Sequence, residues 1–145
     1  MFISGCIIYD PPTGQIEIKN SSDSAIYVYS TCFNDLPCNP ELSYTQSLGD
    51  NSFDANGNKI DTVFFPNYRV NAKSLGTVDM WGTPKDPVVP CDDKKIRLFF
   101  IKESTIKDKS WREICERGLY ISKIVLKQDQ LDSSGWKITY SSRSR

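Results

Sequence analysis

Apolar and polar residues alternate along much of the chain with the two-residue period of β-strands. Ile16 and Ile18 alternate with charged neighbours, and after a polar turn over residues 20–24 the segment 25–30 again has β-rich composition. Short strands joined by a polar loop are typical of antiparallel sheets. The pattern therefore predicts a β-hairpin over residues 15–30.

The strongest strand pattern covers residues 94–102, an apolar block bounded by charged residues. Such a block predicts a central strand, and we expect the core to form around it. Further strands are predicted at 62–65, 76–81, 120–127 and 136–140. Loops are predicted at 33–61, 82–90 and 128–135.

One short helix is predicted at residues 111–117. Ser110 and Glu113 have the spacing of a capping box, in which the Ser110 hydroxyl accepts a hydrogen bond from the Glu113 amide. Gly118 is placed to end the helix in the left-handed conformation. We expect this helix to be the only one. The predicted fold class is mostly β: an antiparallel β-sandwich or small barrel with one short α-helix at about residues 111–117.

The length of 145 residues suits one domain with one core. We expect an N-terminal segment and spacer at 1–14, a single β-rich domain at 15–140 and a disordered tail at 141–145. Lys and Arg number 18, as do Asp and Glu, so the formal net charge is zero. This balance argues against a nucleic-acid partner.

The chain contains no histidine, which excludes Ser-His and Cys-His nucleophile activation within it. Asp92 and Asp93 are adjacent and would point to opposite faces of an extended chain, so we interpret them as a solvated turn. Zinc is disfavoured because there is no histidine and five residues separate the closest cysteines. We predict no catalytic residues, no metal and no cofactor.

The first of five cysteines follows a pattern like a bacterial lipobox. Ile3 is the aliphatic residue, Ser4 and Gly5 are the small residues, and Cys6 is the lipidation candidate. A secretory signal also needs a charged segment and an apolar stretch, which do not fit before Cys6. Either the signal begins upstream, or Cys6 is a buried thiol in a short N-terminal strand.

The other four cysteines are disulfide candidates: Cys32, Cys38, Cys91 and Cys115. Four cysteines allow three pairings. A bond between Cys32 and Cys38 is geometrically easy because the intervening Asn, Asp and Pro residues favour a turn. Cys91 would then pair with Cys115. The alternative is that some of them remain buried thiols.

Tyr27 and Tyr29 are the candidates for a binding surface. They share one face of their strand, opposite Ile26 and Val28, and flat aromatic rings can stack on sugars or peptides. The partner would then be an unknown protein or glycan ligand. The alternative is that these rings belong to the core.

Four loose motifs resemble small uncharacterised lipoproteins of gut Bacteroidota. They are Ile3–Cys6, Ile26–Tyr29, the block Ile96–Ile101 leading to Ser110–Ile114, and the ending Gly135–Tyr140. That family has no assigned activity. The resemblance implies an exported, membrane-anchored, β-rich protein.

Two stretches also look like the O-glycosylation acceptor pattern of that group, an Asp followed by Ser or Thr and a small or aliphatic residue. Ser24 and Thr62 are the glycosylation candidates.

These patterns together predict an exported, lipid-anchored protein of the cell envelope, in the outer membrane or periplasm. We expect a monomeric, non-catalytic binding or structural domain that meets the membrane only through its anchor. The alternative is a cytosolic interaction domain with reduced cysteines. A hydrolase that uses carboxylates is a third, more distant hypothesis.

Overall fold

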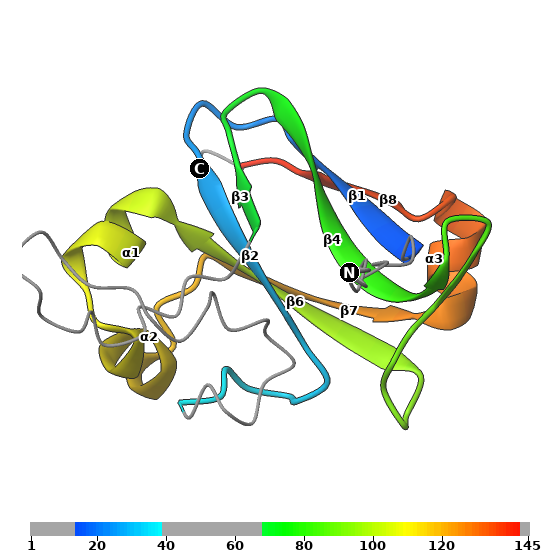
Figure 1. Ribbon diagram of the computed structural model, residues 1–145. Helices are drawn as coiled ribbons and strands as arrows, with labels where there is room; N and C mark the ends of the chain where they lie inside the picture. Colours follow the sequence, from blue (N-terminus) through cyan, green and yellow to red (C-terminus); the bar gives the residue numbers. More distant parts are fainter. Residues whose placement is uncertain (1–13, 39–67, 143–145) are drawn as a thin grey trace, which may run out of the picture.

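The computed structural model describes residues 14–38 and 68–142 (Figure 1). The strands are β1 (Gly14–Asn20), β2 (Ile26–Thr31), β3 (Tyr68–Val70), β4 (Ser74–Thr83), β5 (Asp86–Val88), β6 (Lys95–Lys102), β7 (Ser122–Lys127) and β8 (Lys137–Tyr140). The helices are α1 (Glu103–Asp108), α2 (Trp111–Arg117) and α3 (Gln128–Ser134). The mostly-β prediction is confirmed.

Two four-stranded sheets pack face to face as a β-sandwich. One has the order β5-β4-β1-β8 and the other the order β3-β2-β6-β7. The pairs are antiparallel except for β1 and β8, which run parallel. The first sheet is therefore mixed, whereas the sequence pattern predicted antiparallel pairing throughout.

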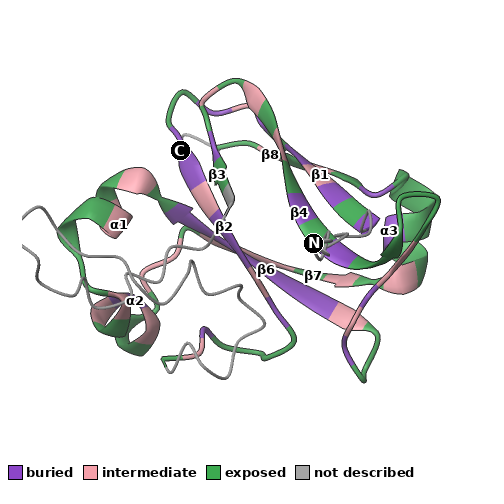
Figure 2. Cartoon of the chain, viewed as in Figure 1, coloured by how far each residue is buried: buried purple, intermediate pink, exposed green. Residues whose placement is uncertain are grey.

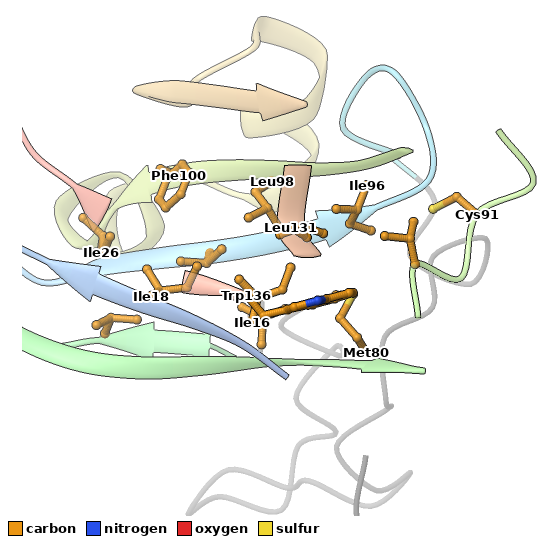
Figure 3. Packing of buried hydrophobic residues seen from close by; sticks show 14 residues of the cluster. Ile16, Ile18, Ile26, Met80, Cys91, Ile96, Leu98, Phe100, Leu131 and Trp136 are labelled. Carbon is orange, nitrogen blue, oxygen red and sulfur yellow. The ribbon is translucent and has the colours of Figure 1, made fainter. Parts of the chain in front are cut away.

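The main core lies between the sheets and is formed by the inward positions of alternating strands. Ile16 and Ile18 of β1 face Leu98 and Phe100 of β6 across this core (Figure 3). Leu131 of α3 and Trp136, just after that helix, belong to the same core cluster (Figure 3). Because side chains alternate across a strand, the polar neighbours of these residues point outward.

β6 is buried along nearly its whole length, as expected for the apolar block at 94–102 (Figure 2). Phe100 and Leu98 face the main core, while Phe99 and Ile101 face a second apolar cluster on the other side of the sheet. Figure 1 shows α1 and α2 on that side. The molecule therefore has a third, partly helical layer.

The predicted hairpin over residues 15–30 is wrong, although both of its strands form. β1 pairs with β4 and β8, whereas β2 pairs with β3 and β6, so the two strands lie in different sheets. The turn between them crosses the sandwich. A polar turn has much the same composition whether it joins two paired strands or two sheets, so the local pattern could not separate the two.

The helix at 111–117 is confirmed at both ends. The Ser110 hydroxyl accepts from the Glu113 amide at 3.2 Å, and Gly118 adopts φ 61°. The expectation of a single helix is wrong, because α1 and α3 also form. α1 buries no residue and α3 buries only Leu131, so neither has the apolar stripe that would mark it in the sequence.

Other predicted segments have mixed outcomes. β4 is longer than the predicted strand at 76–81, and β7 begins at Ser122 rather than at residue 120. The predicted connector at 82–90 contains β5, which forms a hairpin with β4. The predicted strand at 62–65, the segment 1–13 and residues 39–61 lie outside the described residues.

Candidate functional site

The four cysteines predicted to form disulfides do so, but with a different pairing. Cys32 bonds to Cys91 and Cys38 bonds to Cys115, with Cα–Cα distances of 5.3 Å in both pairs. The expected pairing within the 32–38 segment is wrong. The antiparallel pairing of β2 with β6 explains this, because Thr31 lies opposite Arg97 and so brings the end of β2 beside the start of β6.

The disulfide between Cys38 and Cys115 fastens the 32–38 segment to α2. Beside it, the indole Nε1 of Trp111 donates to the carbonyl of Pro37 at 2.9 Å. Leu36 and Ile114 are both buried in the second cluster, against Phe99 of β6. The disulfide, hydrogen bond and apolar contacts together hold α2 and the segment against the outer face of the sheet.

Of the two tyrosines proposed as a binding surface, Tyr29 belongs to this second cluster and Tyr27 packs against it. Tyr29 is buried in it and its ring centroid lies 5.1 Å from that of Trp111. Tyr27 is partly buried and packs against the same cluster. Tyr29 therefore does not present a surface to a ligand, because α2 and the 32–38 segment cover its face of the sheet.

A buried arginine joins the 32–38 segment to the turn before β6. The guanidinium of Arg97 donates to both carboxylate oxygens of Asp93, at 3.1 and 2.6 Å, and to the Lys95 carbonyl at 2.8 Å. Its Nε donates to Oδ1 of Asn34 at 3.2 Å. The guanidinium is thus surrounded by acceptors, as a buried charge must be.

The ion pair between Arg97 and Asp93 changes the interpretation of Asp92 and Asp93. Both are exposed in a turn, as predicted, but Asp93 is fixed by Arg97. The hydrogen bond from Arg97 lowers the pKa of Asp93 from 3.8 to about 2. The carboxylate is therefore ionised and paired at neutral pH, which suits a structural role better than proton transfer.

The turn between β1 and β2 is organised by a buried amide. Nδ2 of Asn20 donates to the carbonyls of Ser24, Val70 and Asn71 at 2.8, 3.2 and 3.1 Å. Its Oδ1 accepts from the amide and the hydroxyl of Ser22. The sequence does not single out Asn20, since an Asn in a polar turn gives no sign that it is buried.

Ser24, a glycosylation candidate, lies exposed in this turn. Its side chain is therefore accessible to a modifying enzyme, although accessibility alone does not show modification. Thr62 and the lipidation candidate Cys6 lie outside the described residues.

The hairpin of β4 and β5 carries an aromatic residue that the sequence pattern did not single out. Trp81 is 48% exposed and lies opposite Val88 in the strand register. Residues 81–86 are all exposed, and the Asp86 amide donates to the Thr83 hydroxyl across the turn. Trp81 was one of several aromatic residues in the sequence, and only the sheet register places it on the outer face.

The described residues hold no cluster of three or more His, Cys, Asp or Glu side chains arranged for a metal. Within the same ranges, no helix is long and apolar enough to cross a bilayer. Two disulfides indicate an oxidising, extracellular or periplasmic environment rather than the cytoplasm.

Comparisons with protein-family models, curated proteins and solved structures each found no match.

Proposed function

We propose that the chain is a non-catalytic binding or structural domain of the bacterial cell envelope, exported and anchored by lipid at Cys6. The observation that carries this proposal is the pair of disulfides, Cys32–Cys91 and Cys38–Cys115. Disulfides of this kind persist in oxidising compartments and are rare in the cytosol. The alternative of a cytosolic domain with reduced cysteines does not account for them.

The number of cysteines supports the lipid anchor at Cys6. Of the five cysteines, four are bonded to one another, which leaves no other cysteine of this sequence to form a disulfide with Cys6. A cysteine without a disulfide partner in an oxidising compartment requires an explanation. Acylation of its thiol would provide one. Ile3, Ser4 and Gly5 place Cys6 where a lipoprotein signal peptidase would leave it as the new N-terminus.

The non-catalytic part is supported by how the chemical groups are used. No histidine is present, four thiols are consumed by disulfides, and Asp93 is held by Arg97. The two disulfides and the hydrogen bond from Arg97 to Asn34 fasten the third layer to the sandwich. Such a rigid layer suits a domain that presents a fixed surface outside the cell.

Metabolic labelling tests the anchor. The gene with its native upstream sequence would be expressed in a bacterium that processes lipoproteins and is fed an alkyne-bearing fatty acid. We expect label on the wild type and none on Cys6→Ser, with the wild type in the membrane fraction. Ser4→Ala is the matched control, because it keeps a small residue before Cys6 and should still be labelled.

An unlabelled wild type, with an intact mass equal to that of the unmodified chain, would contradict the anchor. Intact mass also reports glycans, and a glycan lost in Ser24→Ala would establish Ser24 as its site. The same measurement on Thr62→Ala tests the other candidate.

A further inference from the structure

We propose that the free edge of β7 binds an extended, acidic segment of a partner protein, which adds to the sheet β3-β2-β6-β7 as a fifth strand. This inference rests on the binding part of the proposed function and names the class of partner. It does not depend on the anchor at Cys6.

β7 is the longest of the described strands that end a sheet. The sheet orders leave β3, β5, β7 and β8 at the edges, and these strands have 3, 3, 6 and 4 residues. β5 also contains Pro87, which has no N–H to offer. Short strands and proline are common ways to block pairing at a sheet edge. β7 has neither, so it is the edge best suited to accept another strand.

The odd-numbered residues of β7 turn their backbone groups away from β6. At the end of the β6–β7 pair, the Gln128 amide donates to the Lys94 carbonyl. Hydrogen bonds in an antiparallel pair fall on alternate residues, so the even-numbered residues of β7 face β6. In agreement, the Lys127 amide donates to Oε1 of Gln130 instead of to β6.

Lys123 and Val125 therefore offer their amides and carbonyls to a strand from outside. Within the described part of the chain, no hydrogen bond engages these backbone groups. The side chain of Val125 is 45% exposed and lies opposite Arg97, on the outer face of the sheet. A residue of an added strand would pack directly against it. The backbone and Val125 together suit a peptide better than a ligand without a backbone.

The charge beside this edge is positive. Lys95 and Lys127 lie directly opposite each other in the register, and like charges at opposite positions are unfavourable. Neither has an ion-pair partner among the described residues. Asp93, in the turn before β6, is already engaged by Arg97. A carboxylate from a partner would relieve the repulsion between the two lysines.

A second copy of this chain fits the edge poorly. Antiparallel pairing of two β7 strands about Val125 would place Lys123 opposite Lys127 of the other copy, which adds a further contact between like charges. A partner strand with carboxylates at the positions facing these lysines avoids that contact. In strand addition the main-chain hydrogen bonds provide affinity, and side chains at alternate positions provide specificity.

The test titrates a capped peptide, Ser-Glu-Thr-Val-Thr-Glu-Ser, into the isotope-labelled full chain with both disulfides intact. The two Glu side chains and the Val share one face of the extended peptide. We expect saturable changes in the NMR shifts of the Lys123 and Val125 amides, which weaken as salt is raised. The same peptide with Lys in place of each Glu should cause none.

Lys127→Glu should weaken binding of the acidic peptide about tenfold or more, because it places like charges together. Lys19→Glu is the matched control, since Lys19 is an exposed lysine on β1 in the other sheet. It should leave the affinity unchanged. Equal loss of affinity in the two variants would overturn the proposal.

Methylated peptides test the added strand itself. Alternate amides of a bound strand face β7, so N-methylation of one alternate set should abolish binding, whereas N-methylation of the other set should preserve it. Equal effects of the two sets would overturn strand addition, as would the absence of shifts at about 1 mM peptide. A dimer of the free protein through β7 would also overturn it by assigning the edge to a second copy.

The titration separates this inference from the anchor. It uses the free protein, so its result does not depend on whether cells acylate Cys6. Absence of shifts would defeat the acidic partner and leave the anchor standing. An unlabelled Cys6 in cells would defeat the anchor and leave the titration result unchanged.

Discussion

At the scale of single residues, two buried polar side chains join segments of the chain that strand pairing does not bring together. Asn20 joins the turn after β1 to the end of β3, and Arg97 joins the 32–38 segment to the turn before β6. Neither could be identified from the sequence, because nothing in the local pattern shows that these two polar side chains are buried. Both are tested by substitution.

Asn20→Ala should lower the free energy of unfolding by about 2–3 kcal/mol, because it leaves buried carbonyl and amide groups without their partner. Urea denaturation measures this. Ser24→Ala is the control within the same turn, since its side chain is exposed, and it should change stability by less than about 0.5 kcal/mol. Equal effects from the two substitutions would contradict the role assigned to Asn20.

Asp93→Asn should destabilise the protein at neutral pH and reduce its sensitivity to acid. The pKa of Asp93 is lowered from 3.8 to about 2 in the fold, so its ionised form stabilises the folded state above about pH 4. That contribution is lost as the pH falls through about 2. The gap in urea midpoint between wild type and variant should therefore narrow from pH 6 to pH 2.

Asp92→Asn is the control for this measurement, because Asp92 is the exposed neighbour of Asp93 in the same turn. It should leave the urea midpoint close to that of the wild type at each pH. A gap for Asp93→Asn that stays constant with pH would show that the carboxylate charge is not what stabilises Arg97.

At the scale of elements, the sequence predicts segments better than it predicts partners. The block at 94–102 and the capped helix after Ser110 were predicted correctly, because their signals are local: a run of apolar residues in one case, a cap and a glycine in the other. The hairpin failed because pairing depends on the whole sandwich. The disulfide pairing failed for the same reason, since it follows from the register of β2 with β6.

The disulfide between Cys38 and Cys115 should stabilise the third layer more than the sheets. Replacing both cysteines by serine opens a link across 77 residues, which should cost about 3–4 kcal/mol. In hydrogen exchange, protection should fall first in α2 and around Leu36, while β1 and β6 retain theirs.

The matched comparison is the double serine variant at Cys32 and Cys91. Cys91 belongs to the main core cluster, so this variant should lose protection in β6 and in the sandwich as well. Identical exchange patterns for the two double variants would contradict the separation into a sandwich core and an attached layer.

At the scale of the whole molecule, the fold class could be predicted from the sequence, but which side chains lie on the molecular surface could not. The strand periodicity and the turns indicated a β-sandwich, which is what forms. Tyr27 and Tyr29 share a face as predicted, but the sequence could not show that α2 and the 32–38 segment cover it. The outward position of Trp81 likewise follows only from the register of β4 with β5.

The central claim is that this is a disulfide-linked domain of an oxidising compartment, and mapping its disulfides in natively expressed protein tests that claim most directly. Cells would be quenched in acid, free thiols alkylated, and the unreduced protein digested for mass spectrometry. We predict linked peptides joining Cys32 to Cys91 and Cys38 to Cys115, with no alkylation at these four residues. Alkylation of all four would contradict the account.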